Sequence, residues 1–462
     1  MIMIDFGNRK TELWVYPKIN IYQDKIVDAA EFLKFLQKDN KDNLSFKLYV
    51  HFPFCNSFCT FCPYYKVKYK GLSKEEKNKY FNSVINELLW YSKLPYFKNR
   101  PVQSVYFGGG DPCVVETEYL AKILETIYSN FNMSKCEAIT LEGNVRNLSD
   151  DEKQKWFISS GGTRVSFGIQ TFKEELRKKL LLKPTEKEIF DLANQLRRNG
   201  IEDFTFDMIY NFPDQTVEDV ILDAKKAVQL KPMCIDIHNC NVYPNTTFEK
   251  MIRKGDYFKI KPSPEKEVEM YETYSKVLPS LGYKRIGPIF FSEKKDRIKY
   301  DGLEAVMRGC QILGIGPSAR SYLNRRSYRN VVSVTNYIES IKNKKFPLEA
   351  GNIASEQDHL NRKMVFFPTL GWIDKTDIPD NSIIHEKIQV LMESGYLEMD
   401  EKSLRLTKDK GFTYAGNVAD YFTSDEEHKK YMEGLIYCMK YKSNPYNQDN
   451  MGVYKHTENN RN

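Results

Sequence analysis

The sequence of 462 residues contains no run of about 20 apolar residues, the length that a membrane-spanning helix needs. The first residues have no basic segment followed by a long apolar one, so we do not expect a signal peptide. The formal net charge of +7 is modest for this length and is spread along the chain. We therefore expect a cytoplasmic protein with no membrane span and no nucleic-acid partner.

The nine cysteines come without a secretory signal, which argues against a disulfide framework and favours metal binding or redox chemistry. Hydrophobic residues make up 41% and charged residues 28% of the chain, as in soluble globular proteins of this size with two or three domains. The 30 tyrosines and 28 phenylalanines are explained by packed cores more simply than by flat ligand surfaces.

From about residue 46 the sequence alternates short β-branched or aromatic strands with capped amphipathic helices. We expect helix starts at Ser73, Ser149, Thr185 and Thr216, each with an acidic residue three positions later. This alternation predicts βαβ units and a parallel sheet. The expected strands are residues 47–52, 104–107, 138–142, 164–169, 204–209 and 235–242.

Six units are too few for a closed eight-stranded barrel, so the predicted fold is α/β, a partial (β/α)6 TIM-like barrel. A helix, a glycine, a strand, a turn and a second strand in residues 376–410 predict a smaller, mainly helical, winged-helix-like C-terminal domain. The expected divisions are an N-terminal arm (1–45), the barrel (46–300), a linker segment (301–375), the C-terminal domain (376–443) and a polar tail (444–462).

Cys55, Cys59 and Cys62 stand in the spacing C-x3-C-x2-C directly after the first predicted strand. Three thiolates on one loop reach three corners of a [4Fe–4S] cluster, and the fourth iron is then free to bind S-adenosylmethionine. An electron from the cluster would cleave the sulfonium to methionine and a 5′-deoxyadenosyl radical. A structural zinc site and buried free thiols are the alternatives, although zinc usually takes four protein ligands.

Further candidate residues follow successive predicted strands, where parallel sheets carry their chemistry. Glycines let backbone groups approach a ligand closely, and carboxylates and amides accept or donate hydrogen bonds to ribose hydroxyls or an ammonium group. Taken alone, each of them has an alternative explanation as a plain turn, a helix cap or a buried structural polar group, but their positions at successive strand ends favour contact with a ligand. The candidates for binding the cofactor are Gly109, Gly110, Glu142, Gln170 and Asp207.

Three residues are candidates for catalysis. Cys113 follows the glycine turn, and His238 and Cys240 are expected on one face of the sixth strand. Each is a substrate ligand, a hydrogen donor or a core residue. His51 either orients the cluster sulfurs or packs, and the basic run of residues 66–70 either meets an acidic redox partner or substrate carboxylates, or is a solvated loop.

Several segments together resemble the HemN-like radical SAM family, which includes oxygen-independent coproporphyrinogen III oxidases, a heme chaperone, class C methyltransferases and anaerobic heme-degrading enzymes. The resemblance implies that Tyr49 also contacts S-adenosylmethionine, that one or two S-adenosylmethionine molecules bind, and that a flavodoxin- or ferredoxin-type protein donates electrons. It runs from about residue 47 to 330. The segments are residues 49–55, the triplet 108–110, and residues 168–172, 209–216 and 314–321.

Two departures from the oxidases bear on the substrate. Tyr64 stands where those enzymes carry a further cysteine, and Leu182, beside Lys183, stands where they carry an arginine. Residues 141–143 and 163–168 look closer to the heme-degrading branch. The resemblance therefore implies methyl transfer to a tetrapyrrole, with an oxidase-like decarboxylase, a non-catalytic heme chaperone and a methyltransferase acting on a natural product as alternatives.

Overall fold

The computed structural model describes residues 3–11, 26, 28–39, 44–255, 257–259, 262–293, 310–430 and 433. Within them, one large sheet has the strand order β14-β13-β12-β11-β1-β4-β5-β6-β7-β8-β10-β9. Its six central strands run parallel in chain order, as the sequence predicts. They are β1 (Phe46–Phe52), β4 (Val102–Gly109), β5 (Ala138–Gly143), β6 (Arg164–Gln170), β7 (Phe204–Tyr210) and β8 (Cys234–Asn239).

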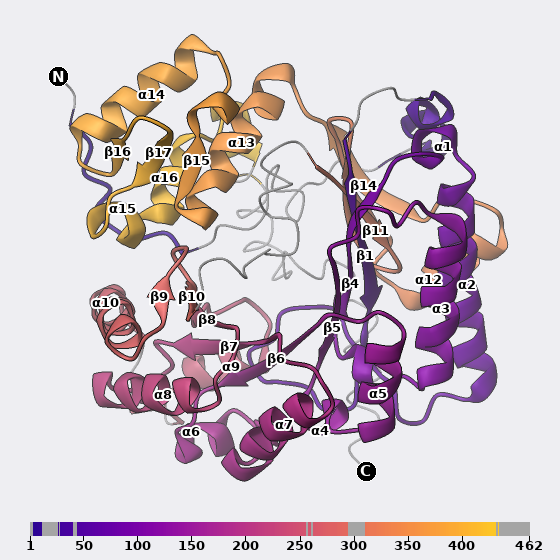
Figure 1. The fold of residues 1–462 in the computed structure, drawn as a ribbon, viewed down its shortest axis with the longest axis horizontal. Helices are drawn as coiled ribbons and strands as arrows, with labels where there is room; N and C mark the ends of the chain where they lie inside the picture. The colour runs from indigo at the N-terminus through magenta and orange to yellow at the C-terminus, as the bar shows by residue number, and fades with distance from the viewer. Residues whose placement is uncertain are drawn as a thin grey trace.

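Helices cover the outer face of this sheet, which curves as an open partial barrel (Figure 1). Most of them pack their apolar stripes against the strands in one continuous core, whereas α6 and α9 pack in a separate small cluster. The expected caps at Ser73, Thr185 and Thr216 are present. The helices are α2 (Lys74–Ser92), α3 (Thr117–Asn130), α4 (Val145–Leu148), α5 (Asp151–Ser159), α6 (Glu174–Lys179), α7 (Glu186–Arg198), α8 (Val217–Gln229), α9 (Thr247–Lys254) and α10 (Pro264–Ser280).

The expected cap at Ser149 is wrong. Asp150 caps α5 instead, because its carboxylate accepts a hydrogen bond from the Lys153 N–H, while Ser149 ends the short helix α4. Two acceptors adjacent in sequence compete for the same orphan N–H groups, and the local turn decides between them.

The segment expected as a linker (301–375) instead extends the barrel sheet. β11 (Gln311–Ile315) pairs in parallel with β1, and three antiparallel strands follow it at that edge. The sequence of this segment is turn-rich, and short edge strands carry a weaker pattern than buried parallel ones. The further strands are β12 (Arg320–Leu323), β13 (Arg326–Asn330) and β14 (Leu348–Ile353), with α12 (Val334–Lys342) between the last two, and β9 (Lys284–Arg285) and β10 (Phe290–Ser292) close the opposite edge. Residues 301–309 lie outside the described residues.

The C-terminal unit has its own hydrophobic core. It begins at α13, earlier than residue 376, and contains the predicted helix, strand, turn and strand. Its elements are α13 (Glu356–Leu370), β15 (Trp372–Asp374), α14 (Ser382–Glu393), β16 (Leu397–Met399), β17 (Ser403–Leu406), α15 (Lys410–Thr413) and α16 (Ala415–Tyr421). The three strands form a small sheet of order β15-β17-β16, and the predicted tail (444–462) lies outside the described residues.

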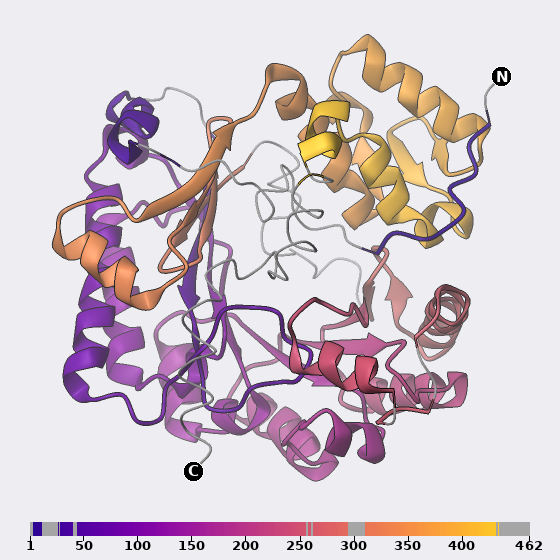
Figure 2. The same ribbon diagram turned by 180° about the vertical axis from the view of Figure 1, so that it is seen from behind.

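The N-terminal arm is packed at two places. Residues 3–11 run along the C-terminal unit, where Phe6 joins its core, and α1 (Ala29–Phe32) with the turn after it packs near β13 at the edge of the barrel sheet (Figure 2). Arg9 connects three parts of the chain: it pairs with Glu267 of α10, bonds the Tyr210 hydroxyl at the end of β7, and donates to the Thr413 carbonyl. No helix in the described part of the chain is both long and apolar enough for a membrane crossing.

Candidate active site

The cysteine loop is closed at its base by two short strands. β2 (Phe54–Cys55) pairs in parallel with β3 (Val67–Lys68), through bonds from Val67 N to Pro53 O (2.6 Å) and from Tyr69 N to Cys55 O (3.2 Å). The Lys66 ammonium donates to the Cys62 carbonyl (2.8 Å) across the loop. All three cysteines are free and half-buried, so the fold presents three thiols on one loop beside the end of β1.

Burial and then the neighbouring thiols raise the pKa of Cys59 to about 11 and that of Cys55 higher still. Thiols in such a setting lose their protons when a cation is bound to them. Within the described residues, no three His, Cys, Asp or Glu side chains gather closely enough to hold a single metal ion. This spacing does not match a compact tetrahedral zinc site, whereas a cubane cluster separates its thiolate ligands more widely.

The glycine turn after β4 packs directly against the cysteine loop. Gly110 N donates to Phe52 O (2.6 Å), and a Cβ at Gly110 would meet Phe54 O at 2.6 Å and the Cys55 sulfur at 3.0 Å. Gly109 has φ +115°, and a Cβ there would lie 2.7 Å from the His51 ring. Only glycines allow this approach of backbone to loop, which leaves backbone groups beside the sulfurs for a small ligand.

Glu142 lies next to this turn, at the end of β5. Its carboxylate accepts a hydrogen bond from Gly109 N (3.2 Å), so Gly109, Gly110 and Glu142 form one group. Cys113 is buried behind it, where its thiol donates to the Glu142 carbonyl (3.5 Å) and burial raises its pKa well above the ordinary range. This position favours packing under Glu142 over a role as hydrogen donor.

Tyr49 and His51 lie on β1 at the same edge. The Tyr49 hydroxyl and His51 Nδ1 share a hydrogen bond of 3.0 Å. Burial, followed by the positive charge of Arg320, lowers the pKa of His51 to about 3, so the ring is neutral. Its Nε2 is buried and has no hydrogen-bond partner among the described residues. A buried nitrogen without a hydrogen-bond partner costs stability unless a ligand or a water molecule forms a hydrogen bond with it. A bound cofactor would supply that partner.

Gln170 ends β6 in a left-handed conformation with φ +73°, at a register shift between β6 and β7. Its side chain folds back over Gly168, and its Oε1 has no hydrogen-bond partner among the described residues. A non-glycine residue at positive φ persists only where the surroundings over-determine it, and such positions cluster at functional sites.

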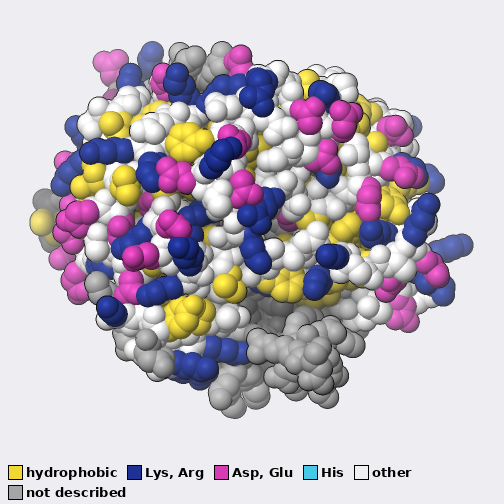
Figure 3. Space-filling view, turned by 90° about the horizontal axis from the view of Figure 1, so that it is seen from below, with side chains coloured by type: hydrophobic (Ala, Val, Ile, Leu, Met, Phe, Trp, Pro, Cys, Tyr) yellow, Lys and Arg dark blue, Asp and Glu magenta, His cyan; other side chains and the backbone are white. Residues whose placement is uncertain are grey.

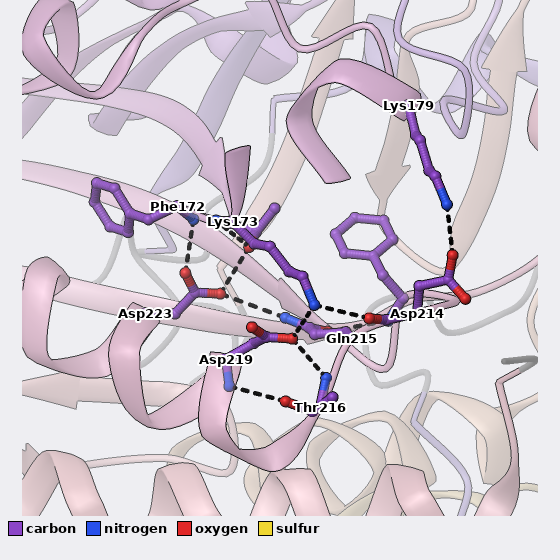
Figure 4. Close-up of polar contacts among 10 residues, drawn as sticks. Phe172, Lys173, Lys179, Asp214, Gln215, Thr216, Asp219 and Asp223 are labelled. Carbon is purple, nitrogen blue, oxygen red and sulfur yellow. Dashed lines mark hydrogen bonds and ion pairs between the residues drawn. The ribbon is translucent and has the colours of Figure 1, made fainter. Parts of the chain in front are cut away.

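The segment after Gln170 is held by a buried polar network (Figure 4). Asp223 of α8 accepts bonds from Phe172 N (2.6 Å) and the Thr171 hydroxyl (2.9 Å), while Lys173 pairs with Asp219 (2.6 Å). These contacts connect the end of β6 to helix α8, and so they set the position of Gln170. Asp223 was not predicted from the sequence. The only feature there that indicates it is an acidic residue on the apolar face of a predicted helix.

Asp207 of β7 faces His238 of β8, with 3.5 Å between Asp207 Oδ1 and His238 Nε2. Burial lowers the pKa of His238, but the hydrogen bond and charge of Asp207 outweigh it and raise the pKa above its ordinary value. Cys240 lies beyond the end of β8, contrary to prediction. Its side chain is buried in a small apolar cluster with Phe212 and Phe248, so it does not share the face of His238.

Two further residues were missed by the sequence reasoning. Glu87 of α2 is fully buried and accepts bonds from Gly316 N (2.8 Å), Asn330 (2.8 Å) and Tyr337 (2.6 Å). A Cβ at Gly316 would lie 2.7 Å from the His51 carbonyl, so Glu87 holds the loop that backs His51. Arg320, in the segment 314–321, brings a positive charge near Tyr49 and His51.

Residues 49–227 match the model of the radical SAM superfamily. This chain carries a radical SAM domain. A domain of this kind implies a [4Fe–4S] cluster and S-adenosylmethionine. Three observations agree with both: the three thiols on one loop, the glycine turn packed against that loop, and the buried His51 Nε2 and Gln170 Oε1 atoms without a hydrogen-bond partner among the described residues. Cys55, Cys59 and Cys62 stay the predicted ligands of the cluster. The predicted contacts of S-adenosylmethionine stay Tyr49, Gly109, Gly110, Glu142, Gln170 and Asp207.

The relatives agree with the resemblance to the HemN-like family. The chain is 29% identical over 406 residues to a heme chaperone HemW from Lactococcus lactis, covering 85% of this chain and 99% of that protein. It is 26% identical over 302 residues to an anaerobilin synthase from Escherichia coli O157:H7, covering 65% and 66%. The structure of coproporphyrinogen III oxidase (HemN) from Escherichia coli superposes with TM-score 0.71 at 21% identity, covering 90% and 99%, which confirms the fold.

Proposed function

We propose that this chain cleaves S-adenosylmethionine reductively and uses the resulting radical chemistry on a tetrapyrrole, with methyl transfer to heme in anaerobic heme degradation as the reaction. The observation that carries the proposal is the cysteine loop, with three half-buried thiols on one loop and Gly110 against Cys55. When bound, the cluster supplies the electron that converts S-adenosylmethionine to methionine and a 5′-deoxyadenosyl radical.

The protein's own groups position the reactants. Gly109 and Gly110 bring backbone groups beside the loop. Glu142, which accepts a hydrogen bond from Gly109 N, brings to the same place a carboxylate, a group that binds an ammonium or a ribose hydroxyl. Because Asp207 raises the pKa of His238, this pair is suited to bind a substrate carboxylate or to hold a proton at Nε2 beside the reacting ring.

Two features support a substrate different from that of the oxidases. Tyr64 is exposed in the cysteine loop, where the oxidases carry a further cysteine. Leu182 packs into the apolar cluster beside α6, and the neighbouring Lys183 is exposed, so neither replaces the expected arginine. Arg177 is buried but is occupied by the Ile169, Thr171 and Pro184 carbonyls. The resemblance of residues 141–143 and 163–168 to the heme-degrading branch supports heme as the substrate, and the chain is also similar to an anaerobilin synthase.

A heme chaperone is the second candidate, because the similarity to the chaperone HemW spans nearly that whole protein. The test is anaerobic incubation of the reconstituted protein with dithionite, S-adenosylmethionine and heme, followed by mass spectrometry. We expect 5′-deoxyadenosine and a methylated tetrapyrrole. Heme transfer to an acceptor without 5′-deoxyadenosine would favour the chaperone, and turnover of porphyrinogen instead of heme would favour an oxidase-like decarboxylase. Activity on neither tetrapyrrole would leave a class C methyltransferase acting on a natural product.

A further inference from the structure

Two tyrosines lie side by side on the inner face of the barrel sheet. Tyr49 of β1 pairs with Tyr106 of β4, and their rings stack with 5.9 Å between centroids and 28° between planes. Leu48 and Val50 point the other way, into the core under the helices, because successive residues of a strand alternate between faces. Both tyrosine side chains are only partly buried, so the pair offers a flat aromatic surface to the barrel interior.

The strand register places a cation at one end of this pair. Gly314 of β11 pairs with Tyr49, and the antiparallel register of β11 with β12 brings Arg320 opposite Gly314. Gly314 has no side chain, so no side chain stands between Tyr49 and Arg320 in this row. Burial lowers the pKa of His51 and the charge of Arg320 lowers it further, which agrees with a guanidinium close to this part of β1.

A second cation lies at the other end of the pair. Lys47 is two residues before Tyr49 on β1, and therefore on the same face of the sheet. Its Nζ lies 5.6 Å from the centroid of the Tyr106 ring, and its side chain is partly exposed. The aromatic surface thus has Lys47 beside one ring and Arg320 beside the other.

Acidic side chains on the inner face stand on other strands. The four strands β1, β4, β11 and β12 contain no Asp or Glu. Glu142 of β5 accepts a hydrogen bond from Gly109 N, Asp207 of β7 faces His238, and Asp236 of β8 accepts from the Cys234 thiol (3.0 Å). The outer surface shows no such separation, since basic and acidic side chains are interspersed on the face in Figure 3.

We propose that Lys47, Tyr106 and Arg320, together with Tyr49, form a subsite for a planar ring system that carries two carboxylates. The ring would lie against the two tyrosines, and each cation would bind one carboxylate. This rests on the proposed function, because a tetrapyrrole with two propionate groups is such a molecule. Arginine binds a carboxylate through two parallel hydrogen bonds, whereas lysine acts as a point charge, so Arg320 orients the ring and Lys47 adds affinity.

The test compares two ligands that differ only in charge, hemin and hemin dimethyl ester. Each is titrated anaerobically into the full-length, cluster-reconstituted protein, and binding is followed by the quenching of tryptophan fluorescence. We expect the wild type to bind hemin at least about tenfold more tightly than the ester, because the ester has lost both carboxylate charges. Arg320→Gln and Lys47→Gln should each weaken hemin binding several-fold and leave binding of the ester unchanged.

Matched variants separate the subsite from general effects on the fold. Tyr106→Leu should weaken hemin and ester binding alike, because the ring surface is lost, whereas Tyr106→Phe should bind both as the wild type does. The charge control is Lys375→Gln/Lys402→Gln on the C-terminal unit, where both lysines are exposed; it should keep the wild-type preference for hemin. Melting temperatures of all variants show whether each has folded.

Three results would overturn the subsite. The first is equal affinity of the wild type for hemin and its dimethyl ester. The second is an unchanged preference for hemin in both Lys47→Gln and Arg320→Gln. The third is a loss of S-adenosylmethionine affinity in Arg320→Gln without any change in hemin binding, because Arg320 would then hold the carboxylate of that cofactor.

Turnover with dithionite and S-adenosylmethionine distinguishes this proposal from the proposed function. Hemin binding that depends on Lys47 and Arg320, without any methylated tetrapyrrole, would overturn the proposed methyl transfer and keep the subsite. Methylation of hemin and of its dimethyl ester with the same KM in the wild type would overturn the subsite alone.

Discussion

Single atoms decide how closely the glycine turn approaches the cysteine loop. At Gly110 there is no space for even a methyl group, because two carbonyl oxygens and the Cys55 sulfur already surround the position. At Gly71, a few residues beyond the loop, φ is +105° but a methyl carbon added there would have no neighbour within 4 Å. At Gly110 a side chain is excluded because there is no space for it, whereas at Gly71 it is disfavoured only by the positive φ.

Gly110→Ala should lower the iron bound per chain after reconstitution by more than half, because the added methyl group pushes β4 away from Cys55. Iron and sulfide content, with the absorbance of the cluster, measures this. Gly71→Ala is the control: it should lose about 1 kcal/mol of stability through its positive φ and keep its iron. Full iron content in Gly110→Ala would show that the close packing of Gly110 against the cysteine loop is not needed for binding the cluster.

The pair of Asp207 and His238 makes a prediction about protonation. In Asp207→Asn the carboxylate charge is removed while the shape is kept, so burial is opposed only by the smaller effect of the Asp236 charge, and the pKa of His238 should fall below its wild-type value. Titration of the imidazole signals by NMR measures it, with His385, exposed on the C-terminal unit, as an internal reference. An unchanged pKa of His238 would mean that the pair does not interact in solution.

At the scale of elements, buried carboxylates fasten loops to the barrel. Glu87 of α2 holds the Gly316 loop through three donors, and Asp223 of α8 holds the segment after Gln170. Burial raises the pKa of both groups to about 7, although their hydrogen bonds oppose this. Both loops lie next to predicted cofactor residues, so the position of these residues depends on side chains from α2 and α8. No local sequence motif identifies those side chains.

The raised pKa of Glu87 predicts how stability changes with pH. The folded protein holds this proton more tightly than the unfolded chain, so the contribution of Glu87 is full below pH 4.5 and is lost as pH rises through about 7. Glu87→Gln should flatten the fall in unfolding free energy between pH 5 and pH 7.5, as measured by urea denaturation. Part of the fall in unfolding free energy should remain in Glu87→Gln, because burial also raises the pKa of Asp223 to about 7.

The control for this experiment is Glu75→Gln, an exposed residue at the start of the same helix, which should leave the slope as in wild type. A slope in Glu87→Gln identical to that of wild type would contradict the assignment.

For the whole molecule, the N-terminal arm joins the barrel and the C-terminal unit. Arg9 and Glu267 are both almost fully buried, Tyr210 donates to the same carboxylate (2.8 Å), and the Arg9 guanidinium lies 3.8 Å above the Tyr271 ring. Lys10 and Phe6 secure the same arm to the C-terminal unit. The arm is therefore a structural part of the interface rather than an appendage.

Arg9→Ala should lower the free energy of unfolding by about 3–5 kcal/mol, since it leaves the Glu267 carboxylate buried without its cation. Denaturation followed by both fluorescence and circular dichroism measures the loss. Arg9→Met with Glu267→Met removes both charges and should recover most of it. A single Arg9→Ala variant as stable as wild type would contradict the role of this pair.

The six parallel strands, the cysteine loop, the glycine turn and the C-terminal helix with its two strands were predictable from sequence. Local patterns determine them: hydrophobic alternation, caps and the spacing of three cysteines act over a few residues. Long-range packing decided the rest. Gln311–Ile315 forms a barrel strand because it pairs with the edge of β1. Cys240 packs in an apolar cluster and does not share the face of His238. Arg9 pairs with Glu267, 258 positions away in the chain. Such contacts depend on which surfaces remain to be buried once the barrel has formed, and no short stretch of sequence records that.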